Sequence, residues 1–68
     1  MEDMHLARRI RAFRKLKGYT QQELADKSGV SLALLGAMER GNRRVEDQIL
    51  DKIANILDVS LSELKLPR

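Results

Sequence analysis

Residues 20–41 read TQQELADKSGVSLALLGAMERG, and this stretch decides the fold because it carries its own helix boundaries. Thr20 and Glu23 have the spacing of a capping box, in which the hydroxyl and the carboxylate each accept a hydrogen bond from the other residue's backbone N–H. The first helix of the stretch should end near Gly29, a residue type that readily adopts the left-handed conformation found at helix ends. Ser31 then caps a second helix. The stretch therefore predicts two short helices joined by a tight turn.

The positions of small and apolar residues predict how these two helices pack. Ala25 is small where two helices that cross at a tight turn approach each other, and Gly29 supplies the positive φ that the turn needs. Leu35 and Met38 lie three residues apart on one face of the second helix, where they can anchor it to a core. Together these features predict a helix-turn-helix at about residues 21–40.

The rest of the chain predicts three more helices and no strand. Apolar residues at helical spacing indicate a first helix that ends at Gly18 and a fourth helix over about residues 46–57. A second capping-box sequence at residues 60–63 opens a short last helix. We therefore expect an all-α fold of five helices, with residues 1–68 forming a single helix-turn-helix domain whose core is small for its surface.

The composition argues against most catalytic and metal-binding classes. The chain has no cysteine and one histidine, so nothing supports thiolate chemistry, a disulfide framework or a zinc site. A glycine-rich phosphate loop and a Ser-His-Asp arrangement are also missing from the sequence. Apolar runs are far shorter than the ~20 residues that span a membrane. We therefore expect a cytoplasmic protein that is not an enzyme and that needs no cofactor or metal.

Positive charge is concentrated in the first two-thirds of the chain. Residues 1–44 carry a net charge of +5, residues 45–68 carry −2, and the whole chain carries +3. Six of the basic residues lie within ten positions, from Arg8 to Lys17. A basic region of this kind indicates a polyanionic partner such as nucleic acid, although a solvated helix face has the same composition.

Three stretches carry a resemblance to a known family: RIRAFRKLKGYTQQELADKSGVS at residues 9–31, MERGNRR at 38–44 and LDKIANILDVSLSEL at 50–64. From about Leu6 to Leu64, the chain resembles the lambda-repressor-like, Cro/XRE-type helix-turn-helix family. The resemblance implies a compact five-helix domain that binds double-stranded operator DNA as a homodimer, with its third helix in the major groove. It also implies a bacterial or phage transcriptional regulator, most often a repressor, located in the cytoplasm and on the nucleoid when bound to DNA.

Several residue roles follow from the resemblance by position. Arg14 and Glu39 match the family's internal ion pair, which ties the first helix to the end of the third. Gln21 and Gln22 stand at the start of the second helix, where the family contacts the DNA backbone and where amide and backbone N–H groups suit phosphate. Further backbone contacts are expected from the polar and basic loop after the third helix, which consists of Asn42, Arg43 and Arg44.

The family's base-reading positions fall on a segment with little capacity for hydrogen bonding. The residues of this segment that we expect to contact DNA are Ser31, Leu32, Ala33, Leu34 and Ala37. Family members commonly place polar or basic side chains at several of these positions, so bidentate base recognition is not available from these side chains. The segment also contains Gly36, and a glycine inside a helix costs about 1 kcal/mol relative to alanine. Its presence indicates that something approaches this face closely.

Three hypotheses account for this apolar helix. In the first, its side chains contact thymine methyl groups in the major groove, and DNA shape adds specificity. In the second, the helix-turn-helix no longer reads DNA, and Leu32 and Leu34 form a patch that docks another protein, such as an antagonist or a second copy of the chain. In the third, the leucines simply enlarge the core. We favour the first hypothesis.

A candidate dimer surface lies in the last third of the chain. Ile49 and Ile56 are seven residues apart, beside the expected core face of the fourth helix. Three leucines follow toward the C-terminus, namely Leu61, Leu64 and Leu66. A homodimer using this region would place two third helices about one DNA turn apart. The alternative is that Ile49 and Ile56 only cover the edge of the core.

Overall fold

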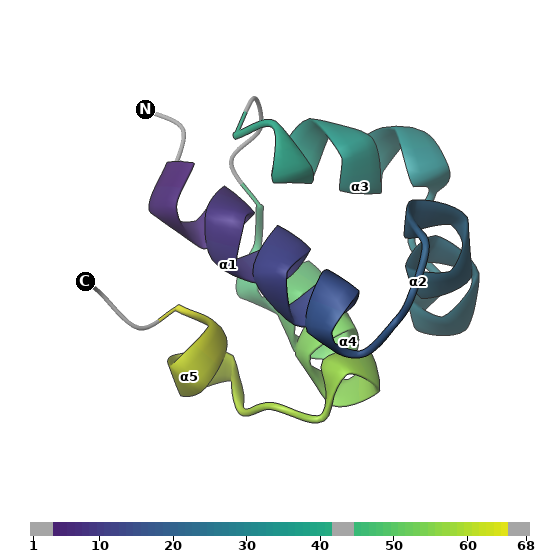
Figure 1. Cartoon of the computed structure of the whole chain (residues 1–68). Helices are drawn as coiled ribbons and strands as arrows, with labels where there is room; N and C mark the ends of the chain where they lie inside the picture. Colours follow the sequence, from purple (N-terminus) through teal and green to yellow (C-terminus); the bar gives the residue numbers. More distant parts are fainter. Residues whose placement is uncertain (1–3, 42–44, 66–68) are drawn as a thin grey trace.

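The computed structural model describes residues 4–41 and 45–65, and within them the chain forms five helices (Figure 1). Their bounds are α1 Met4–Leu16, α2 Gln21–Ser28, α3 Leu32–Glu39, α4 Asp47–Leu57 and α5 Leu61–Leu64. None of the described residues lies in a strand, so the predicted all-α fold of five helices is confirmed. No helix in these two segments is long and apolar enough to cross a membrane.

The helices are arranged so that α3 lies at one end of the molecule (Figure 1). Helix α2 packs against both α3 and α4, α1 packs against α3 and α5, and α4 packs against α5. In Figure 1, α3 runs across the top, while α5 lies on the other side of α1, at the lower left. Helices α1 and α2 therefore support α3 from one side and leave its outward side open.

Every helix contributes at least one fully buried apolar side chain to a single core. The largest of these side chains belong to Ile10, Leu24, Leu35, Leu50, Ile53, Leu57 and Leu64. Burying such a side chain stabilises the fold by about 1.5–3 kcal/mol relative to leaving it exposed. Leu64 fills the core from α5, so the prediction that it belongs to a dimer interface is wrong.

The segment from α2 into α3 has the conformation that its sequence predicts. The Thr20 hydroxyl accepts a hydrogen bond from the Glu23 N–H at 3.0 Å, and the Glu23 carboxylate accepts one from the Thr20 N–H at 2.8 Å. At the other end of α2, Gly29 adopts φ 73° and ψ 21°, in the left-handed region. The N–H groups of Gly29 and Val30 both donate to the carbonyl of Ala25, which closes the helix. This turn sets the angle at which α3 leaves α2.

Both ends of α3 are fixed by local contacts. At its start, the Ser31 hydroxyl accepts a hydrogen bond from the Leu34 N–H at 3.1 Å. Just beyond its end, Gly41 adopts φ 73°, and the Met4 sulfur of α1 stands where a Cβ on Gly41 would lie. Gly41 therefore serves two purposes, because it allows the left-handed turn and lets α1 approach the backbone.

Candidate nucleic-acid interface

The outward face of α3 carries mainly short side chains. Leu35 and Met38 are buried in the core, and they fix the rotation of the helix about its axis. The exposed or half-buried residues of this segment that were predicted to contact DNA are Ser31, Leu32, Ala33 and Ala37. Because two of these side chains are single methyl groups, a partner can come close to the backbone of α3.

Leu34 contributes only partly to this face. Its side chain is half-buried and packs against the core, whereas Leu32 is 42% exposed. An apolar docking patch made of both leucines is therefore reduced largely to Leu32. The hypothesis of an enlarged core applies to Leu34 but not to Leu32.

The first turn of α2 presents backbone N–H groups and two glutamine side chains. The first N–H groups of a helix have no partner within the helix, and together they suit an anion. Gln22 is exposed, and its amide nitrogen donates to Asp26 at 2.9 Å. Gln21 is half-buried, and its amide nitrogen donates to Glu39 at 3.2 Å. Gln21 therefore links the start of α2 to the end of α3.

Arg14 and Glu39 form a two-point ion pair between α1 and the end of α3. Arg14 Nε donates to Glu39 Oε2 at 2.7 Å, and Arg14 Nη2 donates to Glu39 Oε1 at 3.0 Å. The two side chains are 11% and 2% exposed. Arg14 Nη1 also donates to the Tyr19 carbonyl at 2.9 Å. With Gln21, this network joins α1, the loop before α2, α2 itself and α3, and it fixes the two helices of the motif relative to each other.

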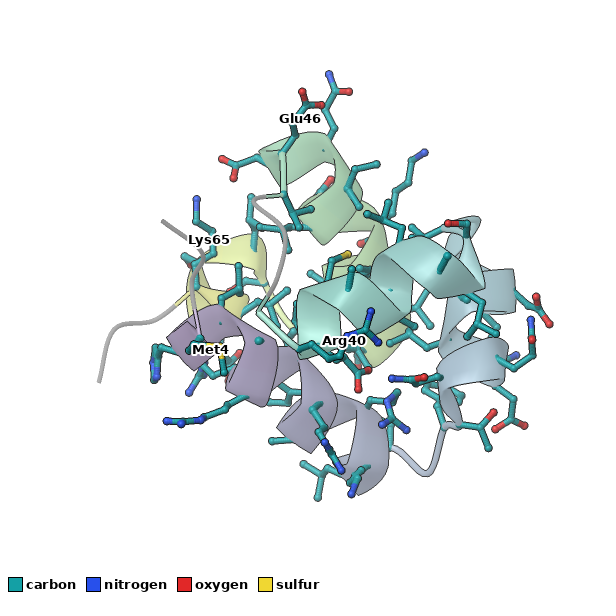
Figure 2. All side chains as sticks on the ribbon, turned by 90° about the horizontal axis from the view of Figure 1, so that it is seen from above. Met4, Arg40, Glu46 and Lys65 are labelled. Atoms are coloured by element: carbon teal, nitrogen blue, oxygen red, sulfur yellow. The ribbon has the colours of Figure 1, made fainter. Side chains whose placement is uncertain are left out.

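Gly36 is buried, and the group that approaches it comes from the residue that directly follows α3. The atom nearest to the position of a Cβ on Gly36 is Nη1 of Arg40, at 3.2 Å. Arg40 is the exposed residue directly after α3 (Figure 2). Sequence reasoning assigned no site role to Arg40, although its spacing of four residues from a mid-helix glycine was a signal that could have revealed one.

The other predicted site residues fall into two groups. Those outside the described residues are Asn42, Arg43, Arg44 and Leu66. Ile49, Ile56 and Leu61 are half-buried and pack against the core, so they cover its edge while keeping some exposed surface. Over residues 4–41 and 45–65, no group of three or more His, Asp or Glu side chains could hold a metal ion.

Two short helices joined through a left-handed glycine, the second lying open at the surface, define a helix-turn-helix domain. The comparison with protein families agrees with this geometry. The chain belongs to the Cro/C1-type helix-turn-helix family HTH_3, whose model matches residues 10–64. The family resemblance read from the sequence is thereby confirmed.

Similar proteins are transcriptional regulators. The uncharacterized HTH-type transcriptional regulator YazB of Bacillus subtilis is 49% identical over 67 residues, which are 98% of this chain and 97% of YazB. The HTH-type transcriptional regulator SinR of Bacillus subtilis is 40% identical over 60 residues, or 87% of this chain. The aligned residues make up 54% of SinR, so this chain spans about half the length of that relative.

Solved structures of SinR have the same fold as this chain. The N-terminal DNA-binding domain of SinR from Bacillus subtilis matches with a TM-score of 0.91 and 36% identity, over 97% of each chain. SinR in complex with DNA matches with a TM-score of 0.86 and 39% identity, over 88% of this chain and 97% of that chain.

Proposed function

We propose that this chain is a sequence-specific transcriptional regulator that binds double-stranded operator DNA as a homodimer and represses transcription. The observation that carries the proposal is the open outward face of α3, which the Arg14–Glu39 network holds beside the start of α2. The major groove of B-DNA is wide enough to admit an α-helix presented in this way. The fold that this chain shares with DNA-bound SinR supports the same assignment.

In this proposal, α2 and the loop after α3 contact the DNA backbone. The backbone N–H groups in the first turn of α2 bind a phosphate, and the amide of Gln22 assists them. The amide nitrogen of Gln21 carries two protons, so one remains for phosphate while the other binds Glu39. The loop residues Asn42, Arg43 and Arg44 add further contacts, which the family resemblance assigns. Each phosphate neutralised by an arginine makes the affinity fall more steeply with salt.

The base contacts in this proposal are mostly apolar. Leu32, Ala33 and Ala37 meet thymine methyl groups, which are the apolar feature that the major groove displays. The Ser31 oxygen accepts the Leu34 N–H, so its hydroxyl proton remains available to DNA. Leu34 reaches the wall of the groove with the part of its side chain that the core leaves exposed.

The size of the molecule supports a dimer. One copy measures 26 × 22 × 20 Å, whereas equivalent half-sites in the major groove lie about 34 Å apart. One copy therefore reads one half-site, and two copies read a near-palindromic operator. The half-buried side chains of Ile49, Ile56 and Leu61 supply the apolar contact between copies, together with Leu66 from the sequence assignment.

Selection from a randomised pool of DNA duplexes, at low and high salt, tests this function. We expect bound duplexes to share a near-palindromic motif, with thymines where Leu32 and Ala33 meet the groove, and we expect the affinity to fall steeply with salt. Salt-sensitive binding without a motif would show that the basic surface binds DNA without recognising its sequence. No binding at either salt concentration would overturn the proposal.

A further inference from the structure

The Arg40 side chain folds back over α3 instead of extending away from the end of the helix. Arg40 directly follows the last residue of the helix, and its N–H donates to the Gly36 carbonyl at 3.1 Å, so the two residues are one helical turn apart. Its Nη1 atom lies 3.2 Å from the point that a Cβ on Gly36 would occupy. Figure 2, which looks down on α3, shows the Arg40 side chain lying against the helix on the side that faces the viewer.

The sequence of α3 explains this conformation. Long side chains on a helix point back toward its N-terminus, so the side chain at position 40 covers the turn that contains position 36. At position 36 there is no side chain to obstruct it, and a Cβ there would be tighter against the guanidinium than most contacts of this type. Glycine is a poor helix former, so its presence in α3 fits a need for this space.

The charge of Arg40 remains available for a partner. The side-chain ion pairs found between described residues are Arg14–Glu39 and Lys65–Asp47, and neither involves Arg40. The neighbouring carboxylate of Glu39 is already taken by two N–H groups of Arg14 and one of Gln21. A guanidinium with five donors therefore lies over Gly36, beside a face whose other exposed side chains are apolar apart from Ser31.

We propose that Arg40 gives this chain specificity for guanine. The space left by the missing side chain of Gly36 positions the Arg40 guanidinium for this contact. This inference rests on the proposed DNA-binding function. The planar guanidinium donates to O6 and N7 of one guanine in each half-site, the pairing that arginine makes most often with a base. The short side chains of Ala33 and Ala37 let α3 enter the groove deeply enough for this contact. Each half-site then combines one guanine with thymines.

The experiment compares four variants with the unmodified chain in selection from randomised duplexes, followed by affinity measurements. The variants are Arg40→Lys, Arg40→Ala, Gly36→Ala and the control Lys65→Ala. The control removes the same charge from the residue directly after α5, a helix that lies on the other side of α1 from α3 (Figure 1), and it breaks only an exposed ion pair. A second probe is the selected duplex with 7-deazaguanine in place of the guanine, which removes the N7 acceptor without disturbing base pairing.

We expect the unmodified chain and Lys65→Ala to select the same guanine. Arg40→Lys and Arg40→Ala should reduce the preference for it by roughly ten- to a hundred-fold, as expected for the loss of one bidentate contact. Arg40→Lys should reduce the guanine preference while the affinity still falls as steeply with salt, because the charge is retained. Gly36→Ala should weaken the guanine preference while the domain unfolds at an equal or higher temperature, since alanine favours a helix. The 7-deazaguanine duplex should bind the unmodified chain more weakly and the Arg40→Ala variant unchanged.

Three results would overturn the inference. The first is a motif for which the unmodified chain shows no greater preference for guanine than the Arg40 variants do. The second is an equal loss of affinity for every sequence in Arg40→Ala, which would make Arg40 a phosphate contact. The proposed function survives both of these results, because a motif is still selected. The third, a complete lack of DNA binding by the unmodified chain, would overturn the function and the inference together.

Discussion

At the scale of single residues, Arg14–Glu39 is the more deeply buried of the two ion pairs found between described residues. Substituting Glu39→Gln removes the negative charge but keeps the shape, and it leaves the buried guanidinium without a counter-charge. We expect this change to lower the free energy of unfolding by about 3 kcal/mol. A domain of this size has a total stability of roughly 3–10 kcal/mol, so urea unfolding monitored by circular dichroism will resolve the loss.

The matched control for this prediction is the exposed ion pair between Lys65 and Asp47, whose side chains are 44% and 63% exposed. Asp47→Asn removes a carboxylate from an ion pair as Glu39→Gln does, but water screens this pair, so the loss should stay below about 1 kcal/mol. Equal losses in the two variants would show that the Arg14–Glu39 pair adds nothing beyond a surface contact.

The sequence predicted only those contacts of this site that depend on the type of side chain at each position. The family resemblance indicated that Arg14 and Glu39 face each other, because arginine and glutamate at those positions match a pattern. It gave no signal for the Tyr19 carbonyl, since a backbone oxygen is the same in every residue type. Gln21 was predicted to contact phosphate, and its hydrogen bond to Glu39 depends on how closely the end of α3 approaches α2, which no local pattern encodes.

At the scale of helices, two glycines with the same positive φ allow the cost of backbone strain to be separated from the cost of a side-chain clash. Gly29 and Gly41 both have φ 73°, and nothing lies within 4 Å of a Cβ built on Gly29, whereas Met4 occupies that place at Gly41. Gly29→Ala should cost about 1–2 kcal/mol through the left-handed conformation alone. Gly41→Ala should cost up to about 1 kcal/mol more, because the sulfur end of the flexible, half-exposed Met4 side chain must move aside.

Chemical denaturation of the two variants measures this difference, and Met4→Ala provides the control. In the Gly41→Ala background, shortening Met4 should restore most of the additional loss, while in the Gly29→Ala background it should restore none. If Gly29→Ala and Gly41→Ala lose the same stability, Met4 does not hold α1 against the end of α3.

The bounds of the helices were easier to predict than which of their side chains are buried by neighbouring helices. The bounds of α2 and α3 follow from signals carried by single residues, such as the Thr20–Glu23 capping box, Gly29 and Ser31. The burial of Leu64 and the half-burial of Leu34 depend on which neighbouring helix covers them, and periodicity within one helix does not contain that information. For this reason the sequence did not predict that Leu64, assigned to the dimer surface, is buried. Nor did it predict that Leu34, assigned to the apolar patch, is half-buried.

At the scale of the whole molecule, the two parts of the sequence differ in net charge. The first 44 residues carry a net charge of +5 and include α3, whereas residues 45–68 carry −2 and include the proposed dimer surface on α4 and α5. Positive charge therefore predominates in the part of the sequence that forms α1, α2 and α3, which includes the elements proposed to bind a polyanion. Two copies that meet through α4 and α5 bring the acidic residues of these helices together, and Arg9 of α1, which donates to the Glu63 and Leu64 carbonyls of α5, offsets only part of this charge. Their association therefore depends mainly on apolar contacts.

This arrangement predicts that salt has opposite effects on the two kinds of binding. Raising the salt concentration should weaken DNA binding through counterion release. It should strengthen the dimer or leave it unchanged, because salt screens the repulsion between the acidic residues of α4 and α5 in the two copies. Equilibrium sedimentation of the chain without DNA, at low and high salt, measures the second effect. Ile56→Asn should shift the chain toward monomer, whereas Leu16→Asn, the same kind of change at a residue that is 76% exposed on α1, should not. A chain that stays monomeric at high micromolar concentration in both salts would show that DNA itself must bring the two copies together.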